Sequence, residues 1–520
     1  TEHQAIQMAA KHAQIIIEED QEIKDSHPAA AILVFQRAGS HLRLVLKQLL
    51  SADMIHEVVL WQDGGELDGD FKNEVETSDF DGKRVIFHHS PTPRHQKAKY
   101  EACTEHTSND MVACYSQSVY YNSFGYINSL YANFLREPGL LHAAADAVSF
   151  FHDTELTFID AQDKLHAGLA YLEYGTFFDR QSAHEFLDEA FQAKMSKETL
   201  KLIETFCDTY FSLWLNNPPA LLSNHVEKYH REIGQADLVH RNSYQRRMRP
   251  QQLEALQGAV KLVMDHVHDA SHPNAAVETL RPDGMASCSE DRCLFITNTP
   301  STPPPVQCKT SNEVMTRLKQ LVNVPCPPPP TGSEAEKCVP DKAMSYAIFS
   351  YHHAVDRDKR TLWVSHKNAT VRSYFGVDLL YPRRDIQNIS VVAAHPFQKE
   401  LSLEISADAR EWYTAESISP TVQQLPKLQR LDFSVYTYPL QAMLTRTWAT
   451  IVHPEKSNMD PKHLPPLYIR YIRFTSMRDM GAPFVVSEVD VDHDPELDLE
   501  DEDSVADMAD EAQWVDDEQA

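Results

Sequence analysis

The sequence predicts an α/β domain followed by an all-β sandwich, and three patterns indicate this fold class. Short apolar runs alternate with helical spacings over residues 29–272, which predicts a parallel sheet covered by helices. Prolines and cysteines crowd residues 273–343, and prolines this dense fit neither a helix nor the interior of a sheet. From residue 344 onward, short β-rich runs separated by turn residues are typical of a sandwich.

The elements of the first part follow in chain order. Residues 1–28 are polar, with one helical-looking stretch, and are interpreted as a stem. Apolar runs bounded by turn residues predict strands at 31–35, 55–61, 84–88 and 111–115. Helical spacing of apolar residues predicts helices at 42–50, 96–106, 127–136, 182–192 and 198–215.

The second part is expected to differ in kind. We interpret residues 273–343 as a connector stapled by cysteines, with one short helix at 313–321. The sandwich is expected over residues 344–492, with strands at 361–364, 389–393, 400–405, 431–436 and 467–474. Residues 493–520 form an acidic tail that we predict to be disordered.

Charge is unevenly distributed along the 520 residues. The net charge is −28, and the last 33 residues hold 16 acidic side chains with no Lys or Arg, so the remainder carries −28 + 16 = −12. This balance argues against a nucleic-acid partner but not against a local anionic ligand. The longest apolar run, 29–35, is too short for a membrane-spanning segment. The first residue is Thr1 rather than Met, which is compatible with an upstream anchor.

The eight cysteines indicate an oxidising compartment. No C-x2-C pair typical of a structural zinc site is present. Five cysteines instead crowd the proline-rich segment: Cys288, Cys293, Cys308, Cys326 and Cys338. We predict that they form disulfides and that the protein resides in the secretory pathway (Golgi or ER lumen) or outside the cell. N-x-S/T sequons at Asn368 and Asn388 agree with this location.

Ligands of open α/β sheets bind beyond the carboxyl ends of the strands. The segments at those positions are 36–37, 62–64, 88–89 and 116–118. No glycine-rich dinucleotide or P-loop motif follows any predicted strand, which excludes those two enzyme classes.

Several short blocks resemble a known family. They are AILVFQR at 31–37, EVVLWQDGG at 57–65, QKAKY at 96–100, ACYSQ at 113–117, LHAG at 165–168, GTFF at 175–178 and CDTYFSLW at 207–214. Over roughly residues 29–270 the chain resembles the exostosin-type (family 64) glycosyltransferases, particularly fungal proteins carrying that domain. The resemblance implies a GT-A (Rossmann-like) fold that transfers a sugar from a UDP-sugar to a glycan or glycoprotein acceptor.

The chain departs from this family at the metal motif. The family holds Mn²⁺ or Mg²⁺ with an Asp-x-Asp after the fourth strand, where the cation neutralises the leaving diphosphate. Here the sequence continues Gln117, Ser118, Val119, Tyr120, without a carboxylate, so the metal site cannot be carried over. Three hypotheses follow: the protein is a pseudo-enzyme, basic residues replace the metal, or other carboxylates such as Asp68 and Asp70 serve.

The resemblance also implies site residues. The family's Cys-Asp block matches Cys207 and Asp208, which makes Asp208 the candidate beside the reacting sugar carbon, although an exposed helix position would also explain it. The family's related cysteine implies that Cys207 pairs with Cys288 or Cys293. The candidates for binding the nucleotide and its phosphates are Arg37, Lys97, Lys99, Ser116, Ser118, Arg246 and Arg247, the last two within an arginine cluster at 241–249. Arg37, Lys97 and Lys99 could equally be ordinary surface charges, and the cluster could be a solvated surface helix or loop.

The second part resembles discoidin-like (coagulation-factor C-type) domains. The matching blocks are AVDRD at 354–358, WVS at 363–365, YFGVDL at 374–379, LSLEIS at 401–406 and Trp412. The resemblance implies a galactose-binding-like jelly-roll whose loops bind sugars, lipid head groups or proteins. We therefore predict an exostosin-like glycosyltransferase, with a catalytically inactive carbohydrate-binding or interaction protein as the alternative.

Overall fold

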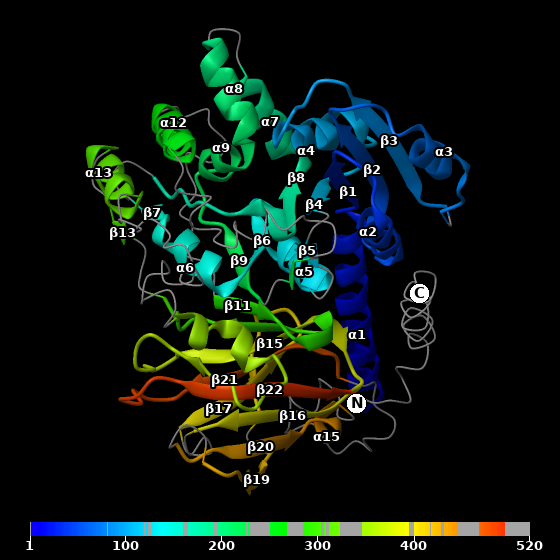
Figure 1. Cartoon of the computed structure of the whole chain (residues 1–520). Coiled ribbons are helices and arrows are strands. Elements are labelled where there is room, and N and C mark those ends of the chain that lie inside the picture. The colour runs from blue at the N-terminus through cyan, green and yellow to red at the C-terminus, as the bar shows by residue number, and fades with distance from the viewer. Residues whose placement is uncertain are drawn as a thin grey trace, which may run out of the picture.

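The computed structural model has an α/β half and a β-sandwich half, joined by one continuous sheet (Figure 1). The structure describes residues 2–80, 82–118, 121–122, 126–159, 165–191, 195–224, 227–228, 250–267, 284–302, 306–307, 311–322, 346–394, 400–415, 418–427, 431–444 and 467–493. The predicted fold class is confirmed: parallel strands with helices form the first half, and antiparallel strands form the second. Over these ranges no helix is long and apolar enough to cross a membrane.

Four parallel strands form the start of the sheet, in the order β3-β2-β1-β4. They are β1 (Ala29–Phe35), β2 (Ile55–Asp63), β3 (Arg84–Ser90) and β4 (Ala113–Ser116). Between them run the helices α2 (Ser40–Ser51), α3 (Gly69–Thr77) and α4 (Lys97–Glu101), the last continuing as a π-helix at Ala102–His106. Strand β1 is almost wholly buried, as expected for a parallel strand covered on both faces.

The sheet continues from the first half into the second without a break. Beyond β4 come β8 (Thr176–Asp179), β6 (His142–Ala145), β9 (Ala220–Ser223), β11 (Gly284–Ser287) and β12 (Leu294–Thr297). They are followed by β15 (Tyr374–Arg383), β21 (Ile469–Ser476), β17 (Leu401–Ser406) and β18 (Tyr413–Thr414). The segment interpreted as a connector thus supplies two central strands, β11 and β12, and its predicted helix is α13 (Ser311–Val322).

A second sheet completes the sandwich. Its strands, in spatial order, are β14 (Trp363–Val364), β22 (Val485–His493), β16 (Ile386–Ala393), β20 (Ser434–Pro439) and β19 (Thr421–Gln424). Phe375 and Phe474 of the long sheet stack on one another, and Phe375 and Trp363 both contact Phe484. Burial of these rings between the two sheets holds the sandwich together.

The remaining described elements lie around these sheets. The helices are α1 (Glu2–Asp25), α5 (Ile127–Arg136), α6 (Ala147–Glu155), α7 (Arg180–Ala190), α8 (Lys197–Thr205), α9 (Cys207–Trp214), α12 (Pro250–Val267) and α15 (Gln441–Leu444). The short 3₁₀ segments are Leu172–Tyr174, Ser289–Asp291 and Tyr351–Ala354. The two-residue strands are β5 (Tyr121–Asn122), β7 (Phe158–Ile159), β10 (Glu227–Lys228) and β13 (Val306–Gln307).

Two expectations are refined by these bounds. The helix predicted at 198–215 is broken at Phe206, which leaves helical geometry with φ −116° and ψ 36°, so Asp208 lies in the first turn of α9. The predicted stem contains α1, which runs beside both halves of the molecule (Figure 1). Arg470 of β21 fixes α1 in place by an ion pair with Asp20 at 3.4 Å.

The disulfides differ from the pairing that the family resemblance implied. Cys288 pairs with Cys293 across the β11–β12 turn, and Cys103 pairs with Cys114. Cys207 is a free, buried thiol, so the predicted bond from Cys207 to Cys288 or Cys293 is wrong. The two partners proposed for Cys207 are five residues apart and bond to each other. Cys308, Cys326 and Cys338 lie outside the described residues.

A buried carboxylate ties the β11–β12 turn to the α/β half. Asp291 accepts hydrogen bonds from the backbone N–H groups of Asn128 and Ser129, in the first turn of α5, and from the Ser287 hydroxyl. Asp291 therefore caps the start of α5, although it lies more than 150 positions further along the chain. Burial raises the pKa of Asp291 to about 7, although these hydrogen bonds favour the ionised form.

We expect the Asp291→Asn substitution to flatten the pH dependence of stability. The pKa of Asp291 is higher in the folded chain than in the unfolded one, so the folded state binds more protons between about pH 4 and pH 7. This contribution is complete below the unfolded pKa and is lost as the pH rises through 7. Urea unfolding should show wild-type stability falling relative to the variant over that window, by a few kcal/mol at most; parallel profiles would contradict this assignment.

Candidate functional site

The strand order gives the α/β half one switch point at which a ligand could bind. Strand β1 has β2 on one side and β4 on the other, so the chain reverses its direction of winding between β1 and β4. Ligands of open α/β sheets bind beyond the carboxyl ends of the strands at such a switch point. Here those ends are followed by Arg37 after β1 and by Ser116–Ser118 at the end of β4.

The polar residues that end β2 hold neighbouring loops. The Gln62 side chain donates to the backbone oxygen of Glu66 at 2.7 Å and accepts from the N–H of Asp68 at 3.0 Å. The buried Asp63 carboxylate accepts from the backbone N–H groups of Arg94 and His95 at 2.7 and 3.0 Å. These two side chains therefore fix the loops that follow β2 and β3.

The end of β4 offers hydroxyl and amide groups. Ser116 and Gln117 are buried and Ser118 is half-buried. The Gln117 side chain accepts a hydrogen bond from the Tyr115 hydroxyl at 2.7 Å, and the Ser118 N–H donates to the backbone oxygen of Glu173 at 2.9 Å. The next two residues of the replaced metal motif, Val119 and Tyr120, lie outside the described residues.

Two predicted site residues meet in a buried ion pair. Lys99 Nζ lies 2.9 Å from Asp208 Oδ2, and the Tyr100 hydroxyl donates to Asp208 Oδ1 at 3.0 Å. The Asp208 N–H in turn donates to the Gln96 side chain at 3.1 Å. Asp208 is only 5% exposed, and both of its oxygens face α4. The interpretation of Asp208 as an exposed helix charge is therefore wrong, and its carboxylate fastens α9 to α4.

The burial of this pair changes the chemistry of its neighbours. Burial, reinforced by the negative charge of Asp208, raises the pKa of Tyr100 well above its usual value. The same two causes raise the pKa of the free Cys207 thiol. Tyr100 therefore remains a hydrogen-bond donor to Asp208 at neutral pH, and Cys207 remains an unreactive thiol.

The other predicted phosphate ligands are placed differently. Lys97 pairs with Glu101 at 2.7 Å and its ammonium lies 4.2 Å from the Phe191 ring centre. Arg37 is exposed directly after β1. Arg246 and Arg247 lie outside the described residues. Arg37 is therefore the predicted cation that stands at the switch point and is exposed to a ligand.

The described carboxylates near the ends of the first strands have other partners. Across the described ranges, no group of three or more His, Cys, Asp or Glu side chains is arranged to hold a metal ion. The carboxylate at the end of β2 is occupied by backbone N–H groups, and Asp68 accepts from the Phe71 N–H as the cap of α3. Asp68 thus serves as a helix cap, and the use of Asp68 and Asp70 in place of the metal motif stays a prediction.

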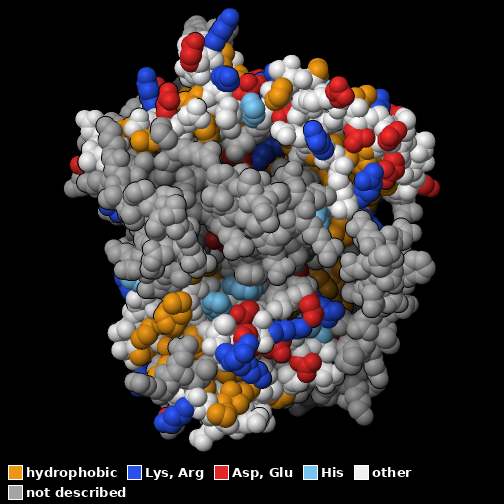
Figure 2. Space-filling model, in the orientation of Figure 1, with side chains coloured by type: hydrophobic (Ala, Val, Ile, Leu, Met, Phe, Trp, Pro, Cys, Tyr) orange, Lys and Arg blue, Asp and Glu red, His pale blue; other side chains and the backbone are white. Residues whose placement is uncertain are grey.

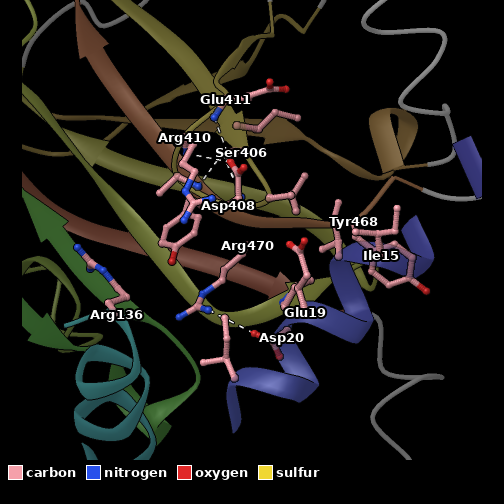
Figure 3. A pocket seen from close by; sticks show the side chains of 18 of the residues that line it. Ile15, Glu19, Asp20, Arg136, Ser406, Asp408, Arg410, Glu411, Tyr468 and Arg470 are labelled. Atoms are coloured by element: carbon pink, nitrogen blue, oxygen red, sulfur yellow. Dashed lines mark hydrogen bonds and ion pairs between the residues drawn. The ribbon is translucent and has the colours of Figure 1, made fainter. Parts of the chain in front are cut away.

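A cavity lies at the junction of the two halves, away from the switch point, and the sequence did not point to it. This junction pocket has a volume of about 630 Å³ and is bounded by α1, the end of α5, the loop at 406–411 and the start of β21 (Figure 3). Its polar side chains include Glu19, Arg136, Asp408, Arg410 and Arg470. They come from four separate segments, so only the folded chain brings them together.

Comparisons with known proteins find similar structures but no similar sequence or family. No family model and no curated protein sequence matches the chain. One similar structure is 4-diphosphocytidyl-2C-methyl-D-erythritol synthase from Anaerococcus prevotii, with 14% identity, 44% of this chain and 99% of that one covered, and a TM-score of 0.27.

Two further similar structures come from Clostridium perfringens. One is CBM32-1 from a family 31 glycoside hydrolase, with 15% identity, 26% of this chain and 80% of that one covered, and a TM-score of 0.17. The other is CpGH89CBM32-4 in complex with glcNAc-alpha-1,4-galactose, with 12% identity, 27% and 79% covered, and a TM-score of 0.16. At TM-scores of 0.27 and below, these likenesses assign neither a family nor a function to this chain.

Proposed function

We propose that this protein is a glycan-modifying enzyme of the glycosyltransferase type, in which the α/β half binds a UDP-sugar at the switch point between β1 and β4. The observation that carries the proposal is the β3-β2-β1-β4 parallel sheet, whose reversal of winding opens between Arg37 and Ser116–Ser118. The exostosin-type resemblance supports the same class of donor. The two disulfides support an oxidising compartment such as the secretory pathway or the extracellular space.

In the proposed reaction the chain's own cations replace the metal. The bond between the sugar's anomeric carbon and the UDP oxygen breaks, an acceptor hydroxyl oxygen bonds to that carbon, and the hydroxyl proton passes to an oxygen of the departing diphosphate. Negative charge then grows on the departing diphosphate, and a guanidinium suits phosphate geometry. We assign this role to Arg37, with the arginine cluster at 241–249 as a second source of positive charge.

Asp208 has a narrower role in this proposal than the resemblance implies. Its oxygens would have to leave Lys99 and Tyr100 before they could approach an anomeric carbon. We therefore propose Asp208 as a positioning residue that holds α4 against α9. Its direct participation in sugar transfer remains a prediction.

The second candidate is a carbohydrate-binding protein without transferase activity. The described end of β4 lacks carboxylates, and the ammonium groups of Lys97 and Lys99 are both held by carboxylates. These features are expected of a domain that has kept the fold of a glycosyltransferase and lost its catalytic activity. The two candidates share glycan recognition and differ in the use of a nucleotide sugar.

Release of UDP distinguishes the two candidates. The full chain would be incubated with a panel of UDP-sugars and mixed glycan acceptors, in buffer containing EDTA, and free UDP would be quantified. The proposal predicts UDP release above the protein-free blank for at least one donor. If no donor yields UDP, with EDTA or with added Mn²⁺, the transferase proposal is wrong and the binding protein is favoured.

We expect the Arg37→Ala substitution to weaken UDP binding by about tenfold to a hundredfold, which corresponds to the loss of one charge-assisted contact. Arg37 is exposed, so the fold should be unaffected. Lys47→Ala is the matched control. Lys47 is also an exposed cation, but it lies toward the C-terminal end of α2, whereas Arg37 precedes the N-terminal end of that helix. Calorimetry showing equal UDP affinity for Arg37→Ala and the wild type would remove Arg37 from the site.

A further inference from the structure

The junction pocket is a formed cavity rather than a gap between loosely placed parts. Its volume of about 630 Å³ falls within the range of about 300 to 1,000 Å³ typical of small-molecule sites. It shares no residue with the switch point between β1 and β4. In Figure 3, Arg136, Arg410 and Arg470 approach the cavity from three different segments.

One wall of the pocket is a loop with a fixed carboxylate. Asp408 Oδ1 accepts hydrogen bonds from the backbone N–H groups of Arg410 and Glu411 at 2.8 and 3.0 Å, and from the Ser406 hydroxyl at 3.2 Å. Burial opposes ionisation, yet these backbone donors lower the pKa of Asp408. The loop therefore presents its polar atoms in one arrangement before any ligand arrives.

The floor of the pocket is fixed in the same way. Arg470 donates to Asp378 at 2.8 Å and pairs with Asp20 of α1 at 3.4 Å. Tyr413 donates its hydroxyl proton to Glu411 at 2.7 Å. Preorganised polar groups of this kind lower the entropic cost of binding a ligand with many hydroxyls.

The charges around the pocket select against ionic ligands. Its lining contains the cations Arg136, Arg410 and Arg470 and the anions Glu19, Asp20, Glu137, Asp408 and Glu411, a formal sum of 3 − 5 = −2. Figure 2 likewise shows Lys and Arg interspersed with Asp and Glu on the visible part of the sandwich half, without a continuous basic patch. A strongly anionic ligand would meet net repulsion here, and the carboxylates of Asp20 and Asp408 are already held by Arg470 and by backbone N–H groups.

The rest of the lining is apolar and aromatic. Tyr413 and Tyr468 contribute rings, and Leu135, Ile405 and Leu467 contribute aliphatic surface. A sugar ring has C–H faces that pack on such surface and hydroxyls that bind planar polar groups such as guanidinium and carboxylate. Apolar walls with a few fixed polar groups are the usual composition of a ligand site.

From these contacts we propose that the junction pocket binds a short neutral oligosaccharide. This inference rests on the proposed function in one respect only: if the protein transfers a sugar, the glycan bound in the junction pocket is the acceptor. Arg410 and Asp408 bind ring hydroxyls, and Tyr468 packs on a sugar face. Because α1 forms one wall, glycan binding also stabilises α1 against the two halves that it contacts.

The test measures glycan binding without a nucleotide. Fluorescently labelled trisaccharides of glucose, of galactose and of N-acetylglucosamine would be titrated with the full chain in EDTA, by fluorescence polarisation. We expect saturable binding of at least one, weakened tenfold or more by Arg410→Ala and by Tyr468→Ala. Arg360→Ala is the control, since Arg360 is an exposed arginine of the same sandwich outside the pocket.

The outcomes separate this inference from the proposed function. Absence of binding by every neutral trisaccharide, or binding that both pocket variants retain, would overturn the inference while UDP release could still succeed. Binding restricted to sulfated trisaccharides and abolished by salt would also overturn it. Binding of a neutral trisaccharide at the pocket without any UDP release would support the inference. It would also favour the carbohydrate-binding protein over the transferase.

Discussion

Replacing Asp208 with alanine is expected to lower the free energy of unfolding by about 3 to 5 kcal/mol. The substitution leaves the ammonium of Lys99 buried without its counter-charge and removes the acceptor of the Tyr100 hydroxyl. Removing one partner of a buried ion pair is costly because the other keeps its desolvation penalty. Urea unfolding, followed by fluorescence of the buried Trp214 on the same helix, measures the change.

Two matched variants show whether the pairing itself causes the loss. Asp208→Asn keeps the size of the side chain and an acceptor for Tyr100, so it should cost less than the alanine variant. Adding Lys99→Met to Asp208→Ala removes the unpaired cation and should recover part of the stability. An alanine variant as stable as the wild type would contradict the structural role. Asp208→Asn that unfolds like the wild type yet releases no UDP would instead establish a direct catalytic role.

The second large effect is expected for Arg470→Met, again a loss of about 3 to 5 kcal/mol. Asp378 is fully buried, and Arg470 is its partner at 2.8 Å. The Leu380 N–H also donates to Asp378 but cannot neutralise its charge. Arg470 additionally pairs with Asp20, so the substitution should loosen α1 before the sandwich unfolds. Hydrogen exchange should show faster exchange in α1, and urea unfolding gives the overall loss.

Arg473→Met is the matched control, because Arg473 lies on the same strand. Arg473 pairs with Glu404 at 2.7 Å, but both side chains are about one-fifth exposed. Exposed and partly exposed pairs contribute about 1 kcal/mol or less. Equal losses for the two arginine variants would contradict the claim that burial of Asp378 sets the size of the effect.

Local patterns in the sequence were sufficient for the first four strands of the α/β half and for several of its helices, but not for α3, α6, α12, β6, β8 or β9. The apolar run at 31–35 became β1, and the leucine spacing at 42–50 became α2. The predicted helix at 127–136 has the same bounds as α5. These elements are set by periodicity and by turn residues, which act over a few positions.

Features that depend on distant contacts were not predictable in this way. Strands β11 and β12 lie in a proline-rich segment, and their place in the sheet depends on pairing with β9 and β15. The Cys288–Cys293 bond is local, but the family resemblance favoured a longer connection. At the candidate site, the residue types were found, yet the pairing of Lys99 with Asp208 joins positions 109 residues apart. The junction pocket combines five segments, none distinctive in sequence.

The proposed function depends most on nucleotide-sugar binding at a switch point that lacks the family's metal carboxylates. Calorimetric titration of the full chain with UDP and UDP-sugars, once in EDTA and once with Mn²⁺, tests this directly. We expect saturable binding with the same affinity in both buffers, weakened by Arg37→Ala. No heat of binding in either buffer would contradict nucleotide-sugar recognition, and binding only with Mn²⁺ would contradict the replacement of the metal by the chain's own cations.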